Sequence, residues 1–212
     1  MGSKREGTRE KIKKTALSLF SQKGYTAVSV REIGGAVGIK ESTLYYHFAS
    51  KQALFDELLH DFEEFTEALP VQFHRKLGEI SRVEKEPFVQ VGLAFLNQYL
   101  LHEKVLPFLR MLSLEQQVNA GAARLYRKAL FDGPLQKDAA VFSFMMEKGL
   151  MKRANPESLA LAYYAPILLI FEDCFAMGDA DEKRKQEANR RLAVYLGDFY
   201  EQYIGGNGHE GV

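Results

Sequence analysis

The sequence has few features that could form disulfides, metal sites or membrane spans. It contains one cysteine, Cys174, which excludes an internal disulfide and a multi-cysteine metal site. Its histidines avoid the HExxH spacing, and neither a GxSxG motif nor a phosphate-binding glycine loop occurs. We therefore expect no catalytic residue, no metal and no cofactor, and a protein that is not an enzyme.

Long apolar runs are also scarce. The run "YYAPILLIF" at 163–171 is too short to span a bilayer and is followed by Glu172 and Asp173. The opening "MGSKREGTREKIKK" is polar and basic, and no early apolar run resembles a signal peptide. We expect a cytoplasmic protein with no membrane partner.

Net charge is absent overall but not locally. Residues 1–55 hold ten basic and four acidic side chains. Because the whole chain has equal numbers of basic and acidic side chains, the rest of the chain has an acidic excess of the same size. A basic first quarter on an acidic remainder indicates that the first quarter meets a polyanion.

Helical spacing dominates the chain, and no sustained alternation of period two occurs. Glycines and prolines mark the helix ends. The fold class is therefore all-α, with predicted helices over 8–23, 30–37, 41–48, 51–68, 86–103, 105–118, 121–131, 134–148, 156–177 and 181–203.

The sharpest start signal is "SVRE" at 29–32. It fits a capping box in which Ser29 is the N-cap and Glu32 reaches back, with Val28 and Ile33 placed as a hydrophobic staple. Gly38 ends this short helix, and "GIK" leads into another short helix. Two short helices joined by a glycine-bearing turn are a helix-turn-helix candidate.

The stretch "GIKESTLYYHFASK" at 38–51 displays large polar rings on a short helix. Leu44 and Phe48 are four apart and share one face, so the neighbouring hydroxyl and ring side chains point elsewhere. Such side chains can bind phosphate oxygens and base edges. The alternative is that they pack against the following helix.

The segment "TREKIKKTALSLFSQKGYTAVSVREIGGAVGIKESTLYYHFASKQALFDEL", residues 8–58, resembles the TetR family of bacterial transcriptional regulators. The resemblance implies a three-helix DNA-binding head at 1–50 and a helical body at 51–204 that binds a ligand and dimerises, about nine helices in all. Residues 51–68 would form the connecting helix, and 205–212 a disordered tail. The DNA-binding residues implied are Thr26, Ser29, Lys40, Ser42, Thr43, Tyr45, Tyr46, His47 and Lys51.

The chain departs from the family pattern before its Thr-Leu-Tyr run. Family members often have Ser-Lys-Gly where this chain has Lys40, Glu41 and Ser42. Glu41 can accept a hydrogen bond from a cytosine amino group, or it can complement the helix dipole and touch nothing. The operator sequence therefore does not carry over from the family.

Nineteen of the 25 Phe and Tyr residues lie after residue 55. Aromatic and methionine side chains can line an adaptable apolar pocket, although for each of them a plain core position is the alternative. The candidate pocket residues are Phe95, Tyr99, Phe108, Met111, Phe142, Met145 and Tyr163. In the family the last two long helices form the dimer interface, for which the candidates here are Ile167, Ile170, Leu192, Leu196, Phe199 and Tyr203.

The function predicted from the sequence is a DNA-binding transcriptional regulator. In its full form it is a homodimeric repressor, released from a pseudo-palindromic, double-stranded DNA operator by a small, largely hydrophobic effector. The alternatives are a ligand-independent DNA-binding or architectural protein whose body merely dimerises, and an enzyme that carries a helical head. Glu172 and Asp173 could face a cationic effector, but an ion pair or solvent exposure is the favoured interpretation.

Overall fold

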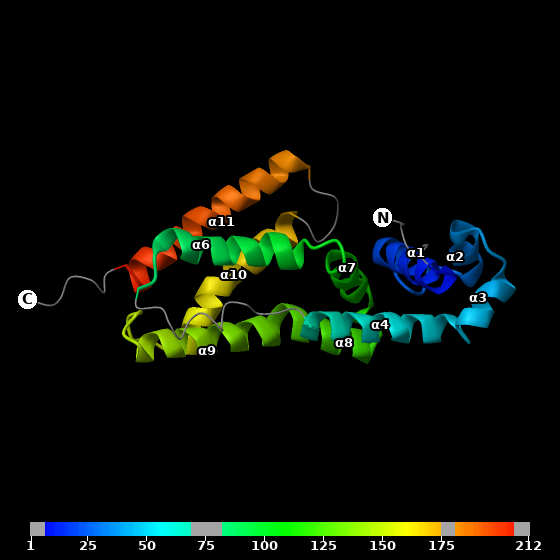
Figure 1. Cartoon of the computed structure of the whole chain (residues 1–212), viewed down its shortest axis with the longest axis horizontal. Coiled ribbons are helices and arrows are strands. Elements are labelled where there is room, and N and C mark those ends of the chain that lie inside the picture. Colours follow the sequence, from blue (N-terminus) through cyan, green and yellow to red (C-terminus); the bar gives the residue numbers. More distant parts are fainter. Residues whose placement is uncertain (1–6, 69–81, 175–180, 206–212) are drawn as a thin grey trace, which may run out of the picture. The chain divides into compact units, whose positions relative to one another are not determined.

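The computed structural model describes residues 7–68, 82–174 and 181–205, and within these ranges it contains helices and no strand (Figure 1). The all-α prediction is confirmed. No helix in the described ranges is long and apolar enough to cross a membrane. The elements are α1 (Thr8–Lys23), α2 (Val30–Val37), α3 (Glu41–His47), α4 (Lys51–Ala68), α6 (Lys85–Ala94), α7 (Leu106–Glu115), α8 (Ala120–Arg127), α9 (Gly133–Glu147), α10 (Pro156–Cys174) and α11 (Glu182–Tyr203), with π-helical segments η2 (Phe95–Leu100) and η3 (Lys128–Asp132).

The chain forms two compact units. The head unit comprises α1 to α4, α7 and α8 as far as Tyr126, and the body unit comprises α6, η2, η3, α9, α10 and α11. This grouping differs from a division at residue 50, because α7 packs against α1. The functional division into 1–50, 51–204 and 205–212 stays a prediction, and the tail from residue 206 lies outside the described residues.

The head helices begin and end where their local signals predict. Ile12, Ala16 and Phe20 of α1 are buried, and the helix ends at Gly24, whose φ of 79° suits glycine. The Ser29 hydroxyl accepts a hydrogen bond from the Glu32 N–H at 3.1 Å, so the predicted N-cap of α2 is present. Gly38 ends α2 in the left-handed conformation.

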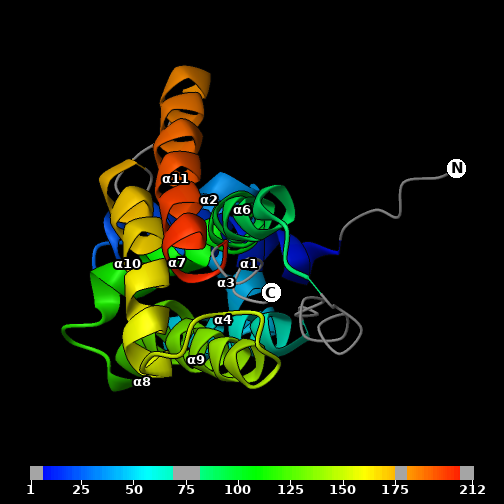
Figure 2. The same ribbon diagram turned by 90° about the vertical axis from the view of Figure 1, so that its left-hand side faces the viewer.

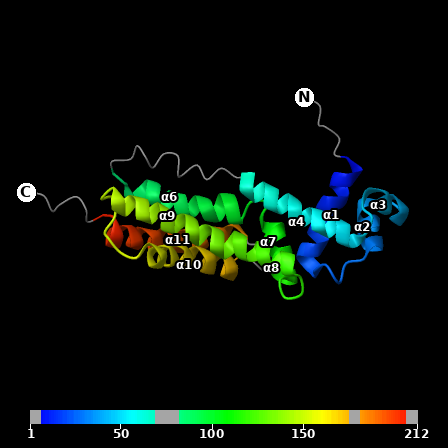
Figure 3. The same ribbon diagram turned by 90° about the horizontal axis from the view of Figure 1, so that it is seen from below.

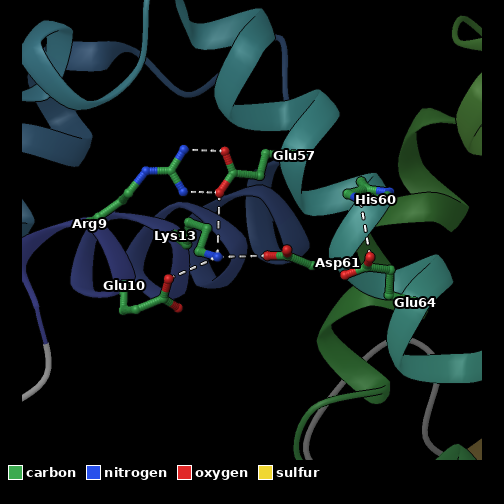
Figure 4. Close-up of polar contacts among 7 residues, drawn as sticks. All are labelled: Arg9, Glu10, Lys13, Glu57, His60, Asp61 and Glu64. Atoms are coloured by element: carbon green, nitrogen blue, oxygen red, sulfur yellow. Dashed lines mark hydrogen bonds and ion pairs between the residues drawn. The ribbon is translucent and has the colours of Figure 1, made fainter. Parts of the chain in front are cut away.

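Ion pairs join α1 to α4 in the head unit (Figure 4). The Arg9 guanidinium bonds the Glu57 carboxylate, and the Lys13 ammonium lies 3.0 Å from Asp61 and 2.9 Å from Glu10. The Lys13 side chain is only 13% exposed, so its charge interacts through a poorly screened environment. The pKa of Glu57 is lowered, first by its hydrogen bond with Arg9.

Aromatic side chains fill the body unit, where α6, α9, α10 and α11 lie together (Figures 2 and 3). The Phe88 ring stacks on Phe199 at a centroid distance of 5.9 Å, and Tyr163 meets both rings at 5.5 Å. Helix α6 approaches α11 closely at Gly92. A Cβ added there would lie 2.5 Å from Leu196 Cδ1 and 3.0 Å from the Tyr163 hydroxyl.

This close approach predicts that Gly92→Ala lowers the free energy of unfolding. The added methyl group overpacks a full core, at a cost of about 1–3 kcal/mol. Gly35→Ala in α2 is the matched control, because a Cβ there meets nothing within 4 Å. The control should be neutral or gain up to about 1 kcal/mol from helix propensity. Urea unfolding at one protein concentration compares the two, and equal effects would contradict the packing argument.

Candidate nucleic-acid interface

The start of α2 is one half of the candidate interface. Thr26 and Ser29 are exposed on the turn that leads into this helix. The first N–H groups of a helix lack partners within it, and together with the helix dipole they favour a phosphate. Ser29 supplies a hydroxyl at this end while capping the Glu32 N–H. The pKa of Glu32 is lowered, first by its hydrogen bond with Lys23.

Helix α3 is the other half, and it separates its two faces as the sequence predicts. Leu44 and Phe48 are buried, whereas Tyr45 is 50% exposed and Tyr46 86% exposed. The Tyr46 ring and the His47 imidazole are nearly perpendicular, with their centroids 5.3 Å apart. For Tyr46 the alternative of packing against α4 is wrong, because solvent surrounds most of its ring.

The remaining residues implied for DNA binding border the same helix. Lys40, Glu41 and Ser42 are exposed at its start, and Thr43 and His47 are half-buried. Lys40 occupies the N-cap position without a side-chain cap. An exposed Glu41 in the first turn is placed to complement the helix dipole, which is one of the two interpretations given for this residue.

Lys51 has a structural role that the sequence did not reveal. Its ammonium group donates to the carbonyl oxygens of Tyr25 at 2.7 Å and Val28 at 2.8 Å, and it lies 4.1 Å from the Tyr25 ring centroid. Burial lowers the pKa of Lys51, and the nearby Glu115 charge opposes that shift. A phosphate contact by Lys51 stays a prediction. In this structure the ammonium group is bound by protein atoms.

The candidate effector residues divide between the two units. Phe108 and Met111 belong to α7 of the head unit, and the other five belong to the body unit. Phe142, Met145 and Tyr163 are buried. Phe95 and Tyr99 lie on η2 with their rings stacked at 4.9 Å, and burial raises the pKa of Tyr99 to about 12. Sequence reasoning missed the π-helical form of this segment.

Two further acidic residues were not predicted from the sequence. Glu115 is buried at the end of α7, and Asp138 lies on the inner stripe of α9, four residues before Phe142 and seven before Met145. The stripe position was a usable signal for Asp138. Glu172 and Asp173 are exposed, and Asp173 lies 3.5 Å from Arg191, so solvent and an ion pair account for them.

The candidate dimer residues are core residues of a single chain. Leu192 and Leu196 have no exposed surface, and Phe199 stacks on Phe88. Ile167 and Ile170 are also buried, and Tyr203 is half-buried. Side chains already covered by their own unit have little surface to offer a second copy. The assignment of these residues to the interface stays a prediction, and exposed side chains of the same two helices are further candidates.

Known proteins are similar to part of this chain in sequence. Residues 12–58 match the family model described as bacterial regulatory proteins, tetR family. The chain is 40% identical over 60 residues to the HTH-type transcriptional repressor KstR2 of Rhodococcus jostii (strain RHA1). That match covers 28% of this chain and 29% of the repressor, so it is confined to less than a third of either protein.

Solved structures share the fold over nearly the whole chain. A putative TetR-family transcriptional regulator from Mesorhizobium loti has a TM-score of 0.66 at 20% identity, covering 93% of this chain and 96% of that one. A putative transcriptional regulator from Saccharomonospora viridis, in complex with choline, has a TM-score of 0.61 at 21% identity, covering 92% and 97%.

The fold and the head define an all-helical protein with an N-terminal helix-turn-helix. Residues 12–58 are similar to the TetR family of bacterial regulatory proteins, as the sequence motifs predicted, and the chain as a whole shares the fold of the solved structures.

The exposure of α3 predicts that Tyr46→Ala weakens specific DNA binding without changing the thermal unfolding temperature. The ring contributes to the outer face and to no core. Tyr46→Phe separates the hydroxyl from the ring, because it keeps stacking and methyl contacts while it removes one hydrogen bond. Fluorescence anisotropy on DNA selected from a random pool measures both variants at one salt concentration. Wild-type affinity in both would contradict the assignment of α3.

Proposed function

We propose that the protein is a homodimeric transcriptional repressor that binds a pseudo-palindromic operator and is released by a small, largely hydrophobic effector. The observation that carries the DNA-binding part is the outward display of Tyr45 and Tyr46 behind the buried pair Leu44 and Phe48. This display occurs inside the segment that matches the family model. A seven-residue helix that buries Leu44, followed by the buried C-cap residue Phe48, gains little stability from its exposed rings, which favours a role in contact with a partner.

The proposed dimer uses the outer faces of α10 and α11. Leu161 and Leu169 are exposed on α10, eight residues apart and therefore on the same face, and Val194 and Tyr195 are exposed on α11. Exposed apolar residues on two helices that contact each other form one patch. In a two-fold dimer this patch meets its own copy, which gives a four-helix arrangement. Two copies would present two α3 helices to half-sites about one helical turn apart.

Leu169→Asp tests the dimer and the operator symmetry together. Leu169 is 67% exposed, so the substitution should leave the subunit folded but place a charge in the interface. Wild type should sediment as a dimer and select pseudo-palindromes from a random DNA pool. The variant should sediment as a monomer and select half-sites with at least tenfold weaker affinity.

Leu114→Asp in α7 is the matched control, because this leucine is also exposed but lies outside the patch. It should remain dimeric and keep the wild-type selection. A wild-type monomer at micromolar concentration, or selection of sites without symmetry, would refute the dimeric repressor. A Leu169→Asp dimer would place the interface elsewhere.

The effector site is proposed in the body unit. The Phe142 and Tyr163 rings are nearly perpendicular, with their centroids 5.5 Å apart, and Asp138 is one helical turn before Phe142 on the same stripe of α9. Burial raises the pKa of Asp138 to about 7, while the Lys137 charge acts in the opposite direction. Burial raises the pKa of Tyr163, and the Asp138 charge raises it further. A carboxylate beside aromatic rings favours a cationic, largely hydrophobic effector.

The choline complex of the Saccharomonospora viridis relative supports a cationic class without naming the effector of this chain. Binding can release the operator only if the effector favours the dimer conformation that does not bind DNA. Tyr99, whose hydroxyl stays neutral well above physiological pH, can donate a hydrogen bond that orients the ligand.

Asp138 predicts a pH dependence in both stability and binding. Its folded pKa of about 7 lies above its ordinary value of 3.8, so the folded state holds a proton that the unfolded state releases between these pH values. The free energy of unfolding should therefore fall as pH rises from 4 to 7. Asp138→Asn should remove that fall and be stabilised relative to wild type at pH 8.

Binding of hydrophobic quaternary ammonium compounds should strengthen from pH 6 to pH 8 in wild type, because the carboxylate ionises. Asp138→Asn should lose this dependence, whereas the exposed Glu147→Gln on the same helix should keep it. Thermal shift at the two pH values measures both effects. A pH-independent response in wild type would remove Asp138 from the effector site.

A further inference from the structure

Among the residues that the structure describes, Glu115 is the one charged side chain that is buried, at 5% exposure. It is the last residue of α7 in the head unit. A carboxylate at a helix C-terminus is repelled by the helix dipole, and burial adds a desolvation cost. Its position therefore does not stabilise α7 itself, and its partners must be sought in other elements.

The partner of Glu115 is the turn between α1 and α2. Its Oε1 atom accepts a hydrogen bond from the Tyr25 N–H at 2.7 Å. The neighbouring Gly24 has a φ of 79°, and a Cβ there would lie 3.1 Å from the same oxygen. The glycine thus permits both the conformation of the turn and the approach of the carboxylate.

The same turn is held from its other side by α4. The Lys51 ammonium donates to the carbonyl oxygens of Tyr25 and Val28, and the Tyr25 hydroxyl bonds the Gln52 side chain at 3.0 Å. Tyr25 therefore has its N–H bound by an anion and its C=O bound by a cation. Hydrogen bonds with one ionised partner are about twice as strong as neutral ones. Two helices distant in sequence fix one residue of the turn.

We propose that Glu115 and Lys51 are positioning residues for DNA binding, which hold the turn at 24–29 so that Thr26 and Ser29 meet the DNA backbone. The proposal rests on the proposed DNA-binding function. Thr26 directly follows Tyr25, and Ser29 directly follows Val28, so both phosphate-facing residues adjoin a clamped carbonyl. Helix α7 in this way sets the phosphate contacts of the head without touching DNA.

The inference separates two kinds of DNA contact. Phosphate contacts act on all sequences alike, whereas base contacts determine discrimination. Glu115→Ala should weaken operator and scrambled DNA by the same factor, about tenfold, and should leave the slope of the salt dependence close to that of wild type, because the lost contacts come from the uncharged side chains of Thr26 and Ser29. The ratio of the two affinities should not change, because α3 is untouched.

Conservative variants distinguish positioning from general stability. Glu115→Gln keeps an oxygen acceptor for the Tyr25 N–H and should bind both DNAs within about threefold of wild type. Glu115→Asp keeps the charge but withdraws it by one methylene, so it should behave like Glu115→Ala and decide the question if the alanine variant does not fold. Glu103→Ala, an exposed glutamate of the same unit, is the matched control and should bind like wild type.

Anisotropy titrations of the full-length chain on operator and scrambled DNA at several salt concentrations give all of these quantities. Wild-type affinity for both DNAs in folded Glu115→Ala and Glu115→Asp would overturn the proposal. A changed operator-to-scrambled ratio would also overturn it, because base contacts would then be affected. Failure of the wild-type chain to bind any selected DNA would instead refute the proposed function.

Discussion

The arrangement of the head depends on the contacts that the Lys51 ammonium group makes. It is held by two carbonyl oxygens of the turn between α1 and α2, and by the face of the Tyr25 ring. These carbonyls have no helical partner, because they lie between two helices. A cation on the first residue of α4 satisfies both and fixes the entry into α2. Removing it leaves two acceptors unsatisfied and takes a positive charge away from the buried Glu115.

Fewer positive charges of residues 1–55 are directed at solvent than the composition of this segment suggests. Residues 1–55 carry ten basic side chains, but Arg9 and Lys13 are paired with acids of α4, and Lys51 faces the turn. Those three charges stabilise contacts between helices rather than a field directed at solvent. The polyanion expected from composition must therefore be met by exposed cations such as Lys14, Arg31 and Lys40, together with the start of α2.

Local signals predicted the helices, whereas contacts between helices required the structure. The caps at Ser29 and Gly38 and the pair Leu44 and Phe48 depend on neighbours in sequence, so the head and its exposed rings were predictable. On α10 and α11 apolar residues occur on more than one face, and the sequence does not show which face covers its own unit. The interface residues were for that reason assigned to the core stripe. The role of Glu115 could not be predicted from the sequence, because its burial depends on a turn ninety residues away.

The small size of α3 explains why its outer face can vary. Seven residues are too few to form a stable helix alone, so the helix exists because Leu44 and Phe48 are buried against the rest of the head. The side chains at 45 and 46 contribute little to that burial, and their identity is free of the packing constraint. The same argument does not hold at the start of α2, where the turn is bound by Lys51 and Glu115 and any change disturbs several bonds. The proposed function would thus place sequence discrimination on the face that contributes least to the fold, and phosphate contact on the segment that the fold holds most firmly.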